Sequence, residues 1–380
     1  MQYRTLGSRT GLKVSALGFG AMRLPMTADE KSVDRELALP MIRRAFEGGV
    51  NYLDSAVGYL NEDSQRACGE ALQDWFRDHP RDSIVVSTKN PFYDKADKKT
   101  WWLNLENSLQ RLRLQRLDVY HHHGLNGKGF DEQVDGPDGL YKEMEKARDQ
   151  GLIRFIAFSF HDTPEQLLRI IETRKFDSMT VQYNMIDQKN VPAIARAHEL
   201  GMGVVIMGPV AGGKLSVTAG PLGEGLPKNV ATTPELALRF VLSNPGVSVA
   251  LSGMTRMSDV EENVQTASRR EPLSAAEKAE TAAAIERLKK LAGMYCTGCR
   301  YCEPCPQEVR IADIFAHLIV HQVYGARQKA RDGYAFMARS NQKTGKKLAE
   351  GCIECGKCEA KCPQKIPIIE QLKRTRKLLE

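Results

Sequence analysis

Residues 117–125 read LDVYHHHGL, a short apolar run that ends in polar side chains. The segment YKEMEKARDQG (141–151) follows it, with the charged, periodic composition of an exposed helix and a glycine at its end. Because the first run is apolar almost throughout, it is typical of a strand that is buried on both faces. The stretch therefore predicts one strand-then-helix unit.

Seven further units of this kind occur between residues 15 and 268. Their apolar runs are SALGFGAM (15–22), VNYLD (50–54), DSIVVSTK (82–89), LIRFIAFSF (152–160), FDSMTVQYN (176–184), MGVVIMGP (202–209) and VSVALSGM (247–254). Eight units in this length predict an α/β fold, a (β/α)₈ TIM barrel. A doubly wound open sheet is the alternative, and it would usually carry a GxGxxG loop after its first strand. GFGAMR (18–23) lacks that pattern, which favours the barrel.

The three consecutive histidines raise the question of a metal site. Successive side chains of a strand point to opposite faces, so His121 and His123 share a face while His122 points away from it. Three adjacent histidines of a regular strand therefore cannot converge on one ion. Barrel enzymes place catalytic groups at the C-terminal ends of the strands, which selects His123 and leaves His122 as packing against the helices.

Other strands of the predicted barrel also end in ionisable side chains. Asp54 ends the second strand with Tyr59 just beyond it, and Lys89 ends the third. An ordinary tyrosine has a pKa of about 10 and is a poor proton donor at neutral pH, but a neighbouring ammonium favours its phenolate. A carboxylate would hold that ammonium, and His123 could orient a carbonyl oxygen. The set fits hydride transfer to a carbonyl, with Tyr59 protonating the oxygen.

The order of motifs along the barrel resembles the aldo-keto reductase family. The motifs are NYLDSAVGY (51–59), VSTK (86–89), LDVYHHH (117–123), FSF (158–160), VQYN (181–184) and VEEN (260–263). The resemblance implies a nicotinamide cofactor and reversible reduction of small carbonyl compounds. By position, Asp54, Tyr59, Lys89 and His123 match the catalytic tetrad of the family.

The resemblance also implies a set of cofactor-binding positions. They are Gly20, Ala21, Asp54, Ser159, Gln182, Met207, Gly208, Pro209, Gly253, Arg256, Glu262 and Asn263. Ser159 and Gln182 match residues that bond the nicotinamide carboxamide, and Glu262 and Asn263 match residues near the adenine. Phe160 replaces the usual asparagine after that serine, and Met207 replaces a stacking tyrosine. Gly253 and Asp259 replace a lysine and an arginine that hold the 2′-phosphate, so the choice between NADP and NAD stays open, with Arg256 as a candidate phosphate contact.

Eight of the nine cysteines lie in two groups after residue 295. The groups are CTGCRYCEPCP (296–306) and CIECGKCEAKCP (352–363). Their spacing is typical of two-cluster ferredoxins, in which the fourth cysteine of each run ligates the other cluster. In the first run, two residues rather than the usual three separate the third cysteine from the fourth. We therefore assign Cys296, Cys299, Cys302 and Cys362 to one [4Fe–4S] cluster, and Cys352, Cys355, Cys358 and Cys305 to a second.

Zinc is the alternative for these cysteines, but zinc sites usually combine two C-x₂-C pairs rather than two runs of four that end in proline. Disulfides are disfavoured because the N-terminal residues show no secretory signal. The stretch 311–338 between the groups has helical periodicity, which predicts a small, mainly helical ferredoxin-like domain. The expected organisation is a barrel over 1–272, a connecting helix over 273–292 and the cluster domain over 293–380.

The composition limits the remaining classes. The chain has 380 residues, a formal net charge of +7 and no apolar stretch long enough for a membrane span, and its N-terminus lacks a secretory h-region. The sequence lacks the interleaved basic and aromatic residues that would indicate nucleic-acid binding. These features predict a cytoplasmic protein.

Two functions remain compatible with the sequence. The first is a redox enzyme in which the barrel exchanges hydride with a carbonyl or alcohol, while the clusters pass electrons to or from a protein partner. The second is a redox-sensing module that binds nicotinamide and iron–sulfur clusters without significant turnover. The intact tetrad favours the enzyme, because a sensor has no need of Tyr59 and Lys89.

Overall fold

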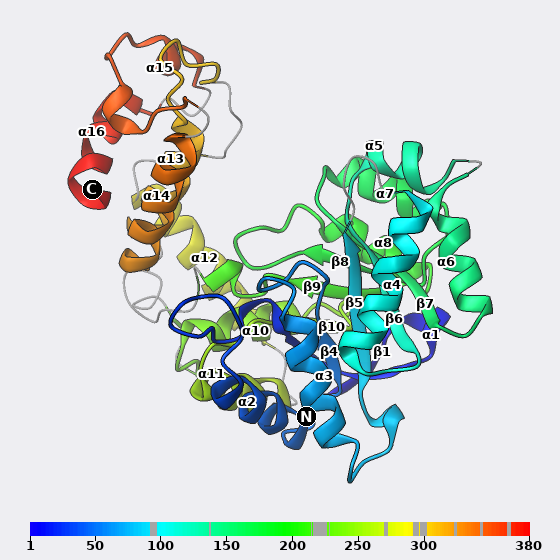
Figure 1. The fold of residues 1–380 in the computed structure, drawn as a ribbon. Helices are drawn as coiled ribbons and strands as arrows, with labels where there is room; N and C mark the ends of the chain where they lie inside the picture. Colours follow the sequence, from blue (N-terminus) through cyan, green and yellow to red (C-terminus); the bar gives the residue numbers. More distant parts are fainter. Residues whose placement is uncertain are drawn as a thin grey trace. The chain divides into compact units, whose positions relative to one another are not determined.

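The computed structural model of the chain falls into two compact units, Met1–Pro209 with Ala237–Pro272, and Val210–Leu236 with Leu273–Glu380. Figure 1 draws them from blue at the N-terminus to red at the C-terminus. The structure describes residues 1–91, 97–136, 138–213, 215, 226–227, 229–269, 273–291, 296, 302–322, 325–342, 345–362 and 366–380.

The first unit is built on a closed barrel of eight parallel strands (Figure 1). The strands are β3 (Leu17–Gly20), β4 (Tyr52–Asp54), β5 (Val85–Pro91), β6 (Leu117–Leu125), β7 (Ile153–Phe160), β8 (Ser178–Gln182), β9 (Gly203–Met207) and β10 (Val249–Ser252). Each strand pairs with the next along the chain, and β10 pairs with β3 to close the barrel. The predicted (β/α)₈ architecture is confirmed, and the open-sheet alternative is excluded.

Helices alternate with these strands along the chain. They are α2 (Arg35–Glu47), α3 (Ser64–Trp75), α4 (Lys98–Leu112), α6 (Leu140–Asp149), α7 (Pro164–Glu172), α8 (Val191–Glu199), α10 (Thr233–Leu242) and α11 (Met257–Ser268), with short turns η1 (Ala21–Arg23), η2 (Arg81–Ser83), α5 (Gly127–Gly129), η3 (Phe130–Val134) and η4 (Ala211–Gly213). Side-chain caps fix several starts: Asp34 accepts from the amide of Leu37, and Asp97 accepts from that of Thr100.

A short hairpin that the sequence analysis did not anticipate precedes the barrel. It consists of β1 (Tyr3–Thr5) and β2 (Lys13–Ser15), joined through α1 (Gly7–Thr10). The apolar cluster to which it contributes contains Leu6, Val14, Tyr52, Val85, Val119, Ala157, Val205, Val249 and Leu251. Several members begin barrel strands, so the hairpin fills the N-terminal end of the interior. The polar groups are left at the other end.

The second unit is mainly helical, as predicted. Its helices are α12 (Ala275–Leu291), α13 (Ile311–Gln322), α14 (Arg327–Gln342), η5 (Ala349–Gly351), α15 (Lys357–Lys361) and α16 (Ile368–Leu379). Helix α13 packs against both α14 and α16. The periodic stretch 311–338 is divided between α13 and α14, and Gly325 between them has a φ of 66°, a left-handed conformation that ends helices. In the described part of the chain, none of the helices combines the length and apolarity that a membrane crossing requires.

Candidate functional site

Asp54, the last residue of β4, and Lys89 of β5 form an ion pair inside the barrel. Asp54 is 4% exposed and Lys89 is 2% exposed. Besides contacting Asp54, Lys89 Nζ donates a 2.9 Å hydrogen bond to the carbonyl oxygen of Ser55, and Ser87 Oγ donates one of 2.8 Å to Asp54 Oδ1. Burial opposes the charge of Lys89, but Asp54 and Tyr59 outweigh it and keep the pKa of Lys89 above its ordinary value. Lys89 is therefore an ammonium at neutral pH.

Tyr59 and His123 lie beside this ion pair. The ammonium of Lys89 is 5.1 Å from the centroid of the Tyr59 ring. The ring of His123, from β6, meets the Tyr59 ring edge-on, with 5.6 Å between the centroids. Burial, together with the nearby charges of Lys89 and His161, lowers the pKa of His123 to about 3. His123 is therefore a neutral hydrogen-bonding group near neutral pH, and the structure brings all four predicted catalytic side chains together.

His121 lies on the same face of β6 and is fully buried. Its Nδ1 is 3.3 Å from the carbonyl oxygen of Thr88 and 3.4 Å from Ser87 Oγ, and its Nε2 is 3.1 Å from Thr180 Oγ1. Since a carbonyl oxygen can only accept, Nδ1 carries the hydrogen and Nε2 accepts from the Thr180 hydroxyl. Burial, and then the charge of Lys89, hold the pKa of His121 well below its usual range.

His122 is turned to the opposite side of β6, as strand alternation requires. Val119 belongs to the barrel-interior cluster, whereas Tyr120 belongs to the core between strands and helices and meets Trp101 edge-on. His122 shares the outward face of Tyr120 and is fully buried, and burial lowers its pKa to about 3. His121 and His123 thus face the barrel interior, whereas His122 faces the core between the strands and the helices.

Two residues expected at the nicotinamide lie at the C-terminal ends of neighbouring strands. Ser159 of β7 is buried and its Oγ accepts a 2.8 Å hydrogen bond from the amide of Gly124. Gln182 ends β8, and a Cβ added to Gly208 would lie 2.7 Å from its Nε2. The backbone of Gly208, with a φ of 64°, thus approaches the Gln182 amide closely, and Asn184 Nδ2 holds the Gly208 carbonyl at 3.0 Å.

The remaining predicted cofactor positions also follow strand ends. Gly20 and Met207 are the last residues of β3 and β9, Ala21 begins η1, and Gly208, Pro209 and Gly253 follow β9 or β10. Arg256 precedes α11 and pairs with Asp259 at 2.9 Å, with its side chain 73% exposed. Glu262 is half-buried on α11, while Asn263 is buried and donates to Ser252 Oγ at 3.0 Å.

Ser87 is a further site residue, not among the predicted ones, although its position carried a signal. Ser87 stands two residues before Lys89 on β5, so both side chains point into the barrel. Thr180, the hydroxyl partner of His121, is a second such residue. Neither residue type is diagnostic by itself, and only the barrel brings Thr180 of β8 opposite His121 of β6.

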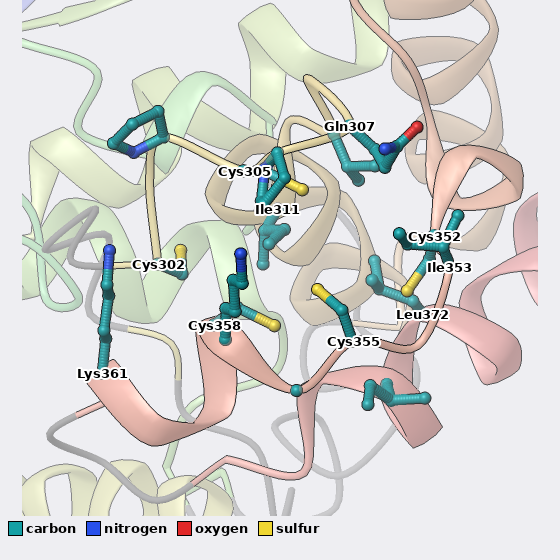
Figure 2. Close-up of a pocket in the computed structure, with 16 residues that line it drawn as sticks. Cys302, Cys305, Gln307, Ile311, Cys352, Ile353, Cys355, Cys358, Lys361 and Leu372 are labelled. Carbon is teal, nitrogen blue, oxygen red and sulfur yellow. The ribbon is translucent and has the colours of Figure 1, made fainter.

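Five cysteines of the second unit line a cavity of about 230 Å³. Its cysteine lining is Cys302, Cys305, Cys352, Cys355 and Cys358. Figure 2 shows the sulfur atoms of Cys305, Cys352, Cys355 and Cys358 turned toward a common space, with Cys302 at one side. Cys362 is buried and Cys296 is half-buried, whereas Cys299 lies outside the described residues.

Thiolates gathered around a cavity suit an iron–sulfur cluster, because soft sulfur ligands at the corners of a cubane stand further apart than ligands of one ion. Within the part of the chain that the structure describes, no three His, Cys, Asp or Glu side chains are grouped so as to hold a single metal ion. The four cysteines assigned to the second cluster all line the cavity. The donor set therefore fits that group.

The fold and the site agree with the comparison to known families. Residues 16–286 match the model of the aldo/keto reductase family, and the chain belongs to this family. Residues 295–366 match the 4Fe–4S dicluster domain. The protein is therefore an oxidoreductase of the aldo-keto reductase type, a family that typically uses NAD(P), with a C-terminal dicluster domain.

Individual relatives are similar over most of the chain. L-galactose dehydrogenase of Arabidopsis thaliana is 27% identical over 321 residues, which cover 77% of this chain and 96% of that protein. The uncharacterized oxidoreductase YqkF of Bacillus subtilis is 26% identical, covering 71% of this chain and 92% of its own. The holo form of the aldo-keto reductase AKR11C1 from Bacillus halodurans superimposes with a TM-score of 0.63 at 27% identity, covering 75% of this chain and 96% of that one.

Proposed function

We propose that the barrel catalyses reversible hydride transfer between NADP or NAD and a small carbonyl or alcohol substrate. When bound, the nicotinamide supplies or accepts the hydride. Tyr59 is the group that protonates the carbonyl oxygen in reduction and accepts the proton in oxidation. The observation that carries this proposal is the position of the Lys89 ammonium between the buried carboxylate of Asp54 and the ring of Tyr59.

Each further group has a separate task. The Lys89 ammonium lies 5.1 Å from the Tyr59 ring centroid, where its charge can stabilise negative charge that develops on the reacting oxygen atoms. Asp54 keeps Lys89 charged in a buried place and is itself held by Ser87. His123 is neutral and meets the Tyr59 ring, so it can donate a hydrogen bond that orients the substrate oxygen beside Tyr59. Ser159 and Gln182 lie at strand ends where they can hold the carboxamide of the nicotinamide.

Replacement of Tyr59 by phenylalanine tests the barrel function. We expect Tyr59→Phe to lower kcat for reduction of a carbonyl panel by about 100-fold or more, which is the usual worth of a general acid. NADPH binding, measured by fluorescence titration, should persist. Tyr3→Phe, at an exposed tyrosine of the N-terminal hairpin, is the matched control. Wild-type protein that binds nicotinamide but turns over no carbonyl would favour the redox sensor instead.

The second part of the proposal is that two [4Fe–4S] clusters occupy the C-terminal domain and exchange single electrons with a protein partner. The cavity lined by cysteines supports it. Iron and acid-labile sulfide analysis of anaerobically purified protein should give two cubanes per chain, and zinc in their place would contradict it. Cys305→Ser should remove one cluster from the electron paramagnetic resonance spectrum, whereas Cys68→Ser, at a buried cysteine of α3, should not.

A further inference from the structure

One wall of the cysteine cavity is also part of the molecular surface. Ile353, Cys355, Lys357 and Lys361 all line the cavity, and all four are exposed, Ile353 to 61%. We call these four residues the 353–361 edge. A single exposed apolar side chain is ordinary on a protein surface, but Ile353 also borders a cavity lined by thiols. The 353–361 edge therefore lines the cavity and also faces solvent.

The 353–361 edge presents two exposed lysines. Within the described part of the chain, neither Lys357 nor Lys361 takes part in an ion pair. Of the two acidic residues in the same segment, Glu354 pairs with Lys373 at 2.7 Å, and Glu359 accepts a 2.8 Å hydrogen bond from the amide of Ile369 and keeps its charge. The two lysines therefore face solvent as free cations. Lys361 lines the same cavity as Cys302, and Figure 2 labels both residues.

These charges matter because of what the cavity would contain. An iron–sulfur cluster held by four thiolates is anionic, and it repels a negatively charged partner unless cations stand between them. Redox encounters use small interfaces, commonly an apolar contact with a charged rim that steers association. Ile353 provides the apolar contact, and Lys357 and Lys361 provide a positive rim.

We propose that the 353–361 edge is the docking surface for an acidic, single-electron carrier protein. This rests on the cluster part of the proposed function. The step is the transfer of one electron between the cluster held by Cys305, Cys352, Cys355 and Cys358 and the carrier: one is oxidised by one electron as the other is reduced by one. No bond is made or broken and no proton moves. Cys355, the exposed ligand, marks the point of closest approach.

The test uses full-length holoprotein whose clusters have been reduced with dithionite and freed of excess reductant. It is mixed anaerobically with one of two single-electron acceptor proteins of opposite charge, an acidic plastocyanin or a basic cytochrome c. At low ionic strength, added salt should slow electron transfer to plastocyanin and should not slow transfer to cytochrome c, since screening weakens only attractive steering. Binding of redox-inactive, zinc-substituted plastocyanin, followed by calorimetry, gives a readout that does not depend on turnover.

Charge reversal at the 353–361 edge distinguishes docking at this surface from an effect of the net charge of the protein. The double variant Lys357→Glu/Lys361→Glu should slow transfer to plastocyanin by about tenfold or more at low ionic strength and speed transfer to cytochrome c. The control is Lys99→Glu/Lys278→Glu, at exposed lysines of α4 and α12 that do not line the cavity, which changes the net charge equally. The control should change either rate by less than about twofold. Ile353→Asp should weaken zinc-plastocyanin binding with the cluster spectrum unchanged.

Equal effects of the edge and control variants would overturn the proposal, and so would unchanged rates and binding in the edge variant. Iron and sulfide content and the spectrum of the reduced clusters show whether each variant is loaded. Protein that never acquires clusters contradicts the cluster part of the proposed function and this inference with it. Wild-type protein that docks plastocyanin but reduces no carbonyl contradicts only the barrel function, so the two failures are distinguishable.

Discussion

His121 and Thr180 meet across the barrel interior, with 3.1 Å between Nε2 of the imidazole and Oγ1 of the threonine. The same imidazole reaches Ser87 through Nδ1, and Ser87 donates to Asp54. A line of neutral donors therefore connects β8 to the carboxylate that pairs with Lys89. It leaves the hydroxyl hydrogen of Ser87 directed at Asp54.

We expect His121→Leu to lower kcat by about tenfold, or about 1.4 kcal/mol of barrier, because Asp54 loses part of its fixed surroundings. The substrate KM should change little, since His121 lies deeper in the barrel than His123. Steady-state kinetics with a purified carbonyl substrate measure both. Thr180→Val removes only the hydroxyl that contacts His121 Nε2, so it should lower kcat less than His121→Leu does. An equal loss in both variants would indicate general damage to the core.

Lys89→Met leaves the carboxylate of Asp54 buried without its cation. Loss of one partner of a buried ion pair typically costs about 3–5 kcal/mol, so we expect a fall of this size in the free energy of unfolding. The double variant Asp54→Asn/Lys89→Met should be more stable than Lys89→Met, because no uncompensated charge remains. Urea titration followed by circular dichroism measures the difference. All of these variants should lack carbonyl turnover.

The buried histidines should make the protein sensitive to acid. His122 stays neutral in the folded chain because burial lowers its pKa to about 3, whereas an unfolded histidine binds a proton below about pH 6.5. The unfolded state then holds more protons, so stability falls as the pH decreases through this window, by about 1.4 kcal/mol per pH unit for each such histidine. His122→Phe should reduce the number of protons taken up on unfolding by about one, and so make the dependence of stability on pH less steep. Unfolding measured at several pH values, with wild type and variant compared in the same buffers, tests the difference.

Gly208→Ala should impair cofactor binding more than folding. Alanine at a φ of 64° is strained by about 1–2 kcal/mol, and its Cβ would also lie 2.7 Å from Gln182 Nε2. The displaced amide should raise the KM for NADPH more than the KM for the carbonyl. Gly151→Ala is the matched control, because Gly151 has a φ of 74° and no heavy atom within 4 Å of the added Cβ. A similar rise of the NADPH KM in both variants would argue against the role of Gln182.

The amino-acid sequence by itself determined the barrel, the helical character of the tail and the grouping of its cysteines. Strand alternation and the rule for strand ends were enough to select His123 over His122, because both depend only on local periodicity. The cysteine spacing was informative for the same reason. The three-residue strands of the N-terminal hairpin were too short to show any period.

The tertiary structure decided what no local pattern contains. Ser87 and Thr180 are ordinary residues until barrel closure brings them to opposite sides of His121, and a sequence records no such proximity. The exposure of Ile353 and Cys355 beside a shared cavity likewise depends on how α13, α15 and α16 pack. Burial and distance set the pKa of Lys89 and His123, so the charge state of the site is a property of the fold.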